Sequence, residues 1–130
     1  MSHFSEQGER RSPKILEIVE NEPRFAYEAY TFVLEALERV VRGLPAARHV
    51  TGQELCGGLR ELAVDRFGPL AKDVLLFWGV RSTEDVGAIV FNLVGAGLLL
   101  TTDEDSPADF VNVFDFGTAF EGPEDASSGP

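Results

Sequence analysis

The sequence predicts an α+β fold: a mostly helical single domain of four or five helices that ends in a C-terminal β-hairpin. Apolar residues recur every three or four positions through much of residues 24–98, as on the buried face of a helix. Residues 98–102 and 110–116 are instead rich in β-branched and aromatic residues, and they flank an acidic turn sequence. A length of 130 residues with 44% hydrophobic residues suits one domain with its own core.

The first predicted helix follows Pro13, which suits a first helical position because proline has no N–H to leave unpaired. This helix covers KILEIVENE and ends before Pro23, with a strand over ILEIV as the alternative. The clearest helix spans residues 24–44 and ends at Gly43 and Pro45. Its apolar stripe consists of Phe25, Ala29, Phe32, Ala36, Leu37, Val40 and Leu44.

Capping signals mark the helices that follow. The sequence TGQE at 51–54 is a capping box, in which the threonine hydroxyl and the glutamate carboxylate each accept a backbone N–H of the other residue. The helix behind it contains Gly57 and Gly58, a pair that predicts close approach of another backbone. Further helices are predicted over 69–78 and from a cap at Ser82 to residue 98.

The predicted hairpin would pair residues 98–102 with residues 110–116, and its second strand carries large apolar side chains on both faces. One face is therefore expected to be covered by a partner. The interface candidates are Phe110, Val111, Val113, Phe114 and Phe116. Polar composition predicts disordered tails at 1–12 and 118–130, which leaves residues 13–117 as the domain.

Charge and composition narrow the classes of partner and compartment. The net charge is −11, which argues against a nucleic-acid partner because binding to phosphates relies on lysine and arginine. The longest apolar window, residues 86–100, is interrupted by glycines and is shorter than the roughly 18 residues of a membrane span. The single cysteine, Cys56, excludes an internal disulfide. We therefore expect a cytoplasmic protein that does not interact with membranes.

Five motifs carry a resemblance to a known family: RFAYEAYTFVLEAL, RHVTGQEL, FGPLAKDVLLFWGV, STEDVGAIVFNLV and DFVNVFDF. Together, over residues 24–120, they resemble a family of small bacterial proteins that has no known activity, ligand or partner. The resemblance implies a bacterial cytoplasmic protein and carries over no functional residues. At the level of fold alone, the predicted order over 70–116 is winged-helix-like, and a fold does not specify a function.

A winged helix would make the helix from residue 82 a recognition helix, with Arg81, Ser82 and Thr83 reading DNA as in a transcriptional regulator. The same region is acidic, however, and its carboxylates would face phosphates. These carboxylates belong to Glu84 and Asp85 on the helix and to Asp103, Glu104, Asp105 and Asp109 at the wing. The sequence therefore favours a basic protein partner over DNA.

Catalytic and metal signatures are weak. Counted from Asp103, an EF-hand loop would need glycine at Ala108 and glutamate at Phe114, so only a looser hard-cation site remains as the alternative. Zinc takes about four ligands, whereas the predicted domain offers only His49 and Cys56. As a nucleophile pair these two would require an exposed Cys56, and free cysteines on helices are mostly core residues. We predict no catalytic residue, metal or cofactor.

The favoured function is a non-enzymatic interaction module whose partner is another protein or a second copy of the chain. A small-molecule-binding protein or small enzyme is a further alternative, with a pocket formed by Tyr27, Tyr30, His49 and Trp78. Asn92 lies in the most apolar helix. It is expected to hydrogen-bond to backbone or to a loop, with a polar anchor in a pocket as the alternative.

Overall fold

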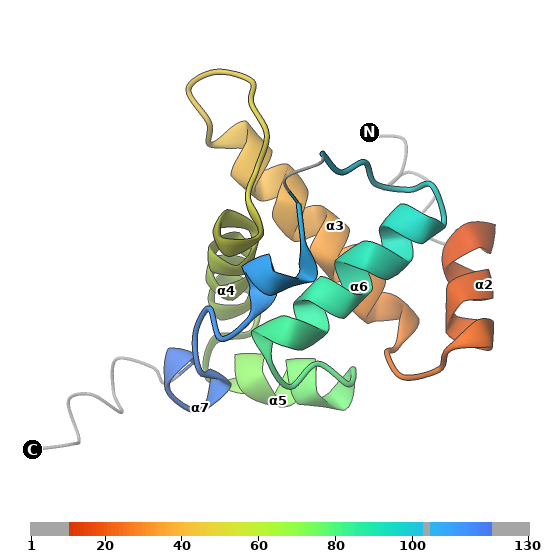
Figure 1. Cartoon of the computed structure of the whole chain (residues 1–130). Helices are drawn as coiled ribbons and strands as arrows, with labels where there is room; N and C mark the ends of the chain where they lie inside the picture. The colour runs from red at the N-terminus through yellow and green to blue at the C-terminus, as the bar shows by residue number, and fades with distance from the viewer. Residues whose placement is uncertain (1–10, 103–104, 121–130) are drawn as a thin grey trace, which may run out of the picture.

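A computed structural model of the chain describes residues 11–102 and 105–120, and these ranges contain helices and no strand (Figure 1). The helices predicted between residues 13 and 98 are confirmed, with slightly different ends. In chain order the elements are α2 (Pro13–Asn21), α3 (Tyr27–Arg42), α4 (Gly52–Phe67), the 3₁₀-helix η1 (Gly68–Leu70), α5 (Ala71–Phe77), α6 (Thr83–Gly95), the 3₁₀-helix η2 (Pro107–Phe110) and α7 (Phe116–Ala119).

The predicted β-hairpin is wrong, and with it the α+β class and the winged-helix-like arrangement. Ser106 and Asp109 form a capping box around η2: the Ser106 hydroxyl accepts the N–H of Ala108 (3.0 Å), and Asp109 accepts that of Ser106 (3.1 Å). Asn112 has a positive φ of 53°, which interrupts an extended strand. Local capping and a left-handed residue therefore override the alternating pattern of residues 110–116.

The helices begin where the capping residues predict. The Thr51 hydroxyl accepts the N–H of Glu54 (3.1 Å), and the Glu54 carboxylate accepts that of Thr51 (2.9 Å). Ser82 likewise accepts the N–H of Asp85 (3.3 Å) at the start of α6. Such caps satisfy backbone donors that a helix leaves unpaired, and each stabilises a helix by about 1 kcal/mol.

Helices α3, α4 and α6 enclose the core, and a glycine sets the distance between the first two. A Cβ added at Gly58 would lie 2.2 Å from Val40 Cγ2 and 3.5 Å from the backbone oxygen of Ala36. Gly58 therefore makes the predicted close approach, against α3. A Cβ at Gly57 would have no neighbour within 4 Å, so only one of the two glycines is required by packing.

The turn between α5 and α6 packs closely on the connection between α2 and α3. Gly79 has φ of 94°, and the neighbouring carbonyl of Trp78 accepts the N–H of Ala26 (3.0 Å). Arg24, from the same connection, forms an ion pair with Asp85, which also accepts the N–H of Arg81 (2.8 Å). These contacts fix the first turn of α6 against the N-terminal part of the domain.

The segment after α6 returns across the helices, so that η2 lies between α4 and α6 (Figure 1). The Thr83 hydroxyl is fully buried there; it donates to the carbonyl of Phe110 (2.7 Å) and accepts the N–H of Val113 (3.1 Å). Arg60 of α4 donates to the carbonyl of Ala119 (2.8 Å). The segment predicted as a hairpin thus closes one side of the core.

The two predicted tails lie largely outside the described residues, namely at 1–10 and 121–130. Of the described part, Ser12 caps α2, and Phe120 is buried directly after α7. Across the part of the chain that the structure describes, no helix combines the length and apolar character needed to cross a membrane.

Candidate functional site

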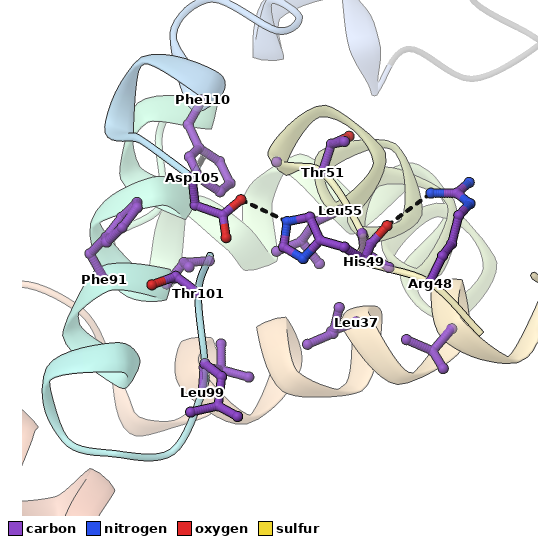
Figure 2. Close-up of a pocket in the computed structure, with 15 residues that line it drawn as sticks. Leu37, Arg48, His49, Thr51, Leu55, Phe91, Leu99, Thr101, Asp105 and Phe110 are labelled. Atoms are coloured by element: carbon purple, nitrogen blue, oxygen red, sulfur yellow. Dashed lines mark hydrogen bonds and ion pairs between the residues drawn. The ribbon is translucent and has the colours of Figure 1, made fainter. Parts of the chain in front are cut away.

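An open groove of about 230 Å³ lies between α3, the start of α4, α6 and the segment that follows α6 (Figure 2). We call it the α3–α4 groove. Its apolar lining consists of Leu37, Val41, Val50, Leu55, Val90, Phe91, Leu99, Leu100 and Phe110. Its polar lining consists of Arg48, His49, Thr51, Thr101 and Asp105, and Gly52 completes the lining.

An arginine–glutamate ion pair and a histidine–aspartate hydrogen bond lie at the rim of the α3–α4 groove. Arg48 donates to both carboxylate oxygens of Glu54, at 3.0 and 2.7 Å. His49 Nε2 lies 2.7 Å from Asp105 Oδ1, so that this pair joins the α3–α4 linker to the segment after α6 (Figure 2). Burial alone would raise the pKa of Asp105, but hydrogen bonds from the Thr102 N–H and from His49 outweigh it and lower the pKa.

The Glu54 carboxylate gives the rim a pH dependence. Its hydrogen bonds, first from Arg48 and then from the Thr51 N–H, lower the pKa of Glu54 from 4.5 to about 2. A lowered carboxyl pKa stabilises the fold above the unfolded value, and this stabilisation is lost as the pH falls. We therefore expect the melting temperature of the wild type to fall more steeply than that of Glu54→Gln between pH 4.5 and about 2.

The matched control for this acid titration is Glu61→Gln, which removes an exposed carboxylate elsewhere on α4. It should keep the steep wild-type decline. Parallel melting curves of Glu54→Gln and the wild type across this pH range would contradict a role for the Glu54 hydrogen bonds.

Apolar side chains remain exposed at the mouth of the α3–α4 groove. The side chain of Leu100 is 93% exposed, and that of Val41 is 49% exposed. Leu99, beside them, is only half-buried although it packs against the core. An apolar hollow bordered by exposed apolar side chains is typical of a surface that another molecule covers.

A second hollow, of about 300 Å³, lies over the first half of α6 and beside η2. We call it the α6 hollow. Its lining is Glu84, Gly87, Ala88, Phe91, Pro107, Ala108 and Val111. Phe91 also lines the α3–α4 groove, so the two sites are neighbours.

The residues predicted to form a small-molecule pocket do not come together. Tyr30 is fully buried, where burial raises its pKa and its hydroxyl accepts a hydrogen bond from Asn92 (3.1 Å). Asn92 thus bonds to a side chain of α3 and not to backbone or a loop. Tyr27 accepts the N–H of Ser12 (2.7 Å), and Trp78 packs against aromatic rings of the core. Among the four, only His49 lines the groove.

The predicted interface residues occupy different environments. Phe110 and Phe116 are buried, Val113 and Phe114 are half-buried, and Val111 is 58% exposed. Val111 therefore offers most of the set's exposed apolar surface, and it lines the α6 hollow. Sequence reasoning did not select Val41 and Leu100, the exposed apolar residues of the groove, nor Leu70 and Phe77, which are 60% and 87% exposed outside it. The run of three leucines at 98–100 was a usable signal, because one helix face or strand face does not bury three consecutive side chains.

The other chemical candidates are held in structural roles. Cys56 is fully buried, and burial raises the pKa of its thiol to about 12, so the thiol is protonated near neutral pH. Among the predicted DNA-reading residues, Thr83 is buried, Ser82 caps α6 and Arg81 is exposed. Asp103 and Glu104 lie outside the described residues. No three His, Cys, Asp or Glu side chains in the described ranges are grouped as metal ligands.

Comparison with protein-family models, curated proteins and solved structures finds no match to this chain. The two hollows are therefore the features of this chain from which a function can be inferred. An open groove with an apolar floor and paired charges at its rim is suited to holding an apolar side chain, with polar contacts around it.

Proposed function

We propose that the protein is a non-enzymatic interaction module whose α3–α4 groove receives an apolar side chain of a basic partner protein. The observation that carries this proposal is the exposure of Leu100, at 93%, beside an open apolar groove. Covering one such side chain contributes about 1.5–3 kcal/mol. A partner that covers Leu100 and Val41 while filling the groove would therefore gain favourable free energy from burying this surface.

Charge supports a basic partner. The chain carries 22 acidic and 11 basic residues. At the groove rim, Arg48 and His49 are already engaged by the carboxylates of Glu54 and Asp105. An approaching surface therefore meets basic groups that are already paired with acids, within a protein field that is negative overall. Such a field accelerates association with positively charged partners and slows association with acidic ones.

The test uses two amphipathic helical peptides with the same leucine face, one carrying lysine and the other glutamate on the polar face. Titrated into ¹⁵N-labelled protein, the lysine peptide is expected to shift the amides of Val50, Thr51 and Thr101. Leu100→Glu should weaken its binding by at least about tenfold, equivalent to about 1.4 kcal/mol. The control is Leu76→Glu, which places the same charge at an exposed leucine on α5, outside the groove lining.

Equal binding of the two peptides, or shifts confined to residues outside the α3–α4 groove, would contradict the proposal. Sedimentation of the protein alone tests whether it forms a dimer. A dimer that Leu100→Glu dissociates and Leu76→Glu does not would identify a second copy as the occupant, in place of a basic partner.

A further inference from the structure

We propose that the partner segment continues from the α3–α4 groove into the α6 hollow, where it places a lysine or arginine against Glu84. This inference rests on the proposed function and extends it, because it specifies a second anchor and the charge that accompanies it.

The α3–α4 groove and the α6 hollow are adjacent. Phe91 lines both, and it is only half-buried. Its ring packs edge-on against the ring of Phe110, with centroids 6.2 Å apart. Phe110 also lines the α3–α4 groove, and its neighbours Ala108 and Val111 line the α6 hollow. One continuous segment that crosses Phe91 can therefore enter both sites.

The shape of the α6 hollow suits an apolar side chain. Gly87, Ala88 and Ala108 line the hollow and present little side-chain volume to it. Gly87 has no room for more, since an added Cβ would lie 2.8 Å from the ring of Phe110. Val111, at the edge, is 58% exposed, so the fold leaves this apolar surface uncovered. The occupant must supply the missing volume, as an aliphatic or aromatic side chain does.

The α6 hollow carries a negative charge. Glu84 is the sole charged residue among those lining the α6 hollow. Its Oε2 accepts the N–H of Asn112 (3.0 Å), which holds the carboxylate at the hollow. In the described part of the chain no lysine or arginine forms an ion pair with it, whereas the next residue, Asp85, is neutralised by Arg24. The charge of Glu84 therefore remains available to a cation, and an acidic partner would be repelled.

The experiment is a double-mutant cycle with the lysine peptide, measured by titration calorimetry. Glu84→Gln removes the charge and keeps an oxygen that can accept the Asn112 N–H, so the local fold is retained. It is expected to weaken binding about two- to fivefold, the range for an exposed ion pair. Replacing the responsible peptide lysine by glutamine should cause a similar loss in wild-type protein and no further loss in Glu84→Gln.

Two further variants separate charge from shape. Glu61→Gln makes the same charge change on α4, away from both hollows, and should leave the affinity unchanged. Ala108→Leu fills the α6 hollow from an exposed position, and it should weaken binding while the melting temperature stays at the wild-type value.

The outcomes distinguish this inference from the proposed function. If Leu100→Glu abolishes binding while Glu84→Gln and Ala108→Leu leave it unchanged, with no coupling to any peptide lysine, the segment does not reach the α6 hollow and this inference is overturned. If the peptide fails to bind wild-type protein, the proposed function fails and the two-anchor arrangement fails with it.

Discussion

Replacing Phe110 with alanine is expected to lower the free energy of unfolding by about 3–5 kcal/mol, the usual loss for a buried phenylalanine. Phe110 is 4% exposed. Its ring fits against two glycines: a Cβ added at Gly52 would lie 3.0 Å from Phe110 Cζ, and one at Gly87 would lie 2.8 Å from Phe110 Cβ. Alanine would leave a cavity between α4 and α6 that these rigid backbones cannot close.

Urea unfolding followed by circular dichroism measures this loss. The control is Val111→Ala, one residue further along, because Val111 is exposed and its truncation should change stability by less than about 0.5 kcal/mol. Comparable small losses for both variants would show that Phe110 is not part of the core. Such small losses would also agree with the sequence-based prediction that Phe110 is an interface residue.

The second large effect is expected at Gly79. Its φ of 94° lies where residues other than glycine are strained by about 1–3 kcal/mol. In addition, a Cβ there would lie 2.4 Å from the carbonyl oxygen of Arg24, a backbone atom that cannot rotate away. Relieving such a contact costs about 1–3 kcal/mol more. Gly79→Ala should therefore be among the most destabilising single-methyl additions to the chain.

Gly57→Ala is the control, and its expected change in stability has the opposite sign. It adds the same methyl group in the interior of α4, where no atom lies within 4 Å of the new Cβ. Alanine in a helix interior is favoured over glycine by roughly 0.5–1 kcal/mol, so the melting temperature should rise. If both variants shift the melting temperature in the same direction, the contact of Gly79 with Arg24 does not decide its effect.

The helices before residue 98 could be predicted because their signals are local. A capping residue and the helix that it starts lie within one turn, as at Thr51 and Ser82. The segment after residue 98 carries one such signal, the capping residues Ser106 and Asp109 around η2, but its path across the core could not be predicted from local signals. Its alternation of apolar and polar residues is typical of a strand, but the structure of this segment depends on Thr83 and on glycines in α4 and α6. Those partners are distant in sequence, and no pattern within the segment identifies them.

The contrast between local signals and partners distant in sequence also applies to the candidate site. The sequence indicates the apolar residues at 110–116 as interface candidates, yet it could not separate buried Phe110 from exposed Val111. The α3–α4 groove was missed because its lining comes from four separate parts of the chain. His49 was selected, but its partner Asp105 was assigned to a wing tip and not to the rim of a groove.

The site into which Phe110 packs also affects the order in which parts of the molecule can form. This packing site consists of residues from α4 and α6, so it exists only after those helices have packed together. Contacts between distant parts of a chain form late because the intervening loop must first be closed. A segment that packs on a core formed by other elements can open locally without unfolding that core. A partner that engages Phe91, Val111 and Glu84 would therefore hold this segment closed on α4 and α6.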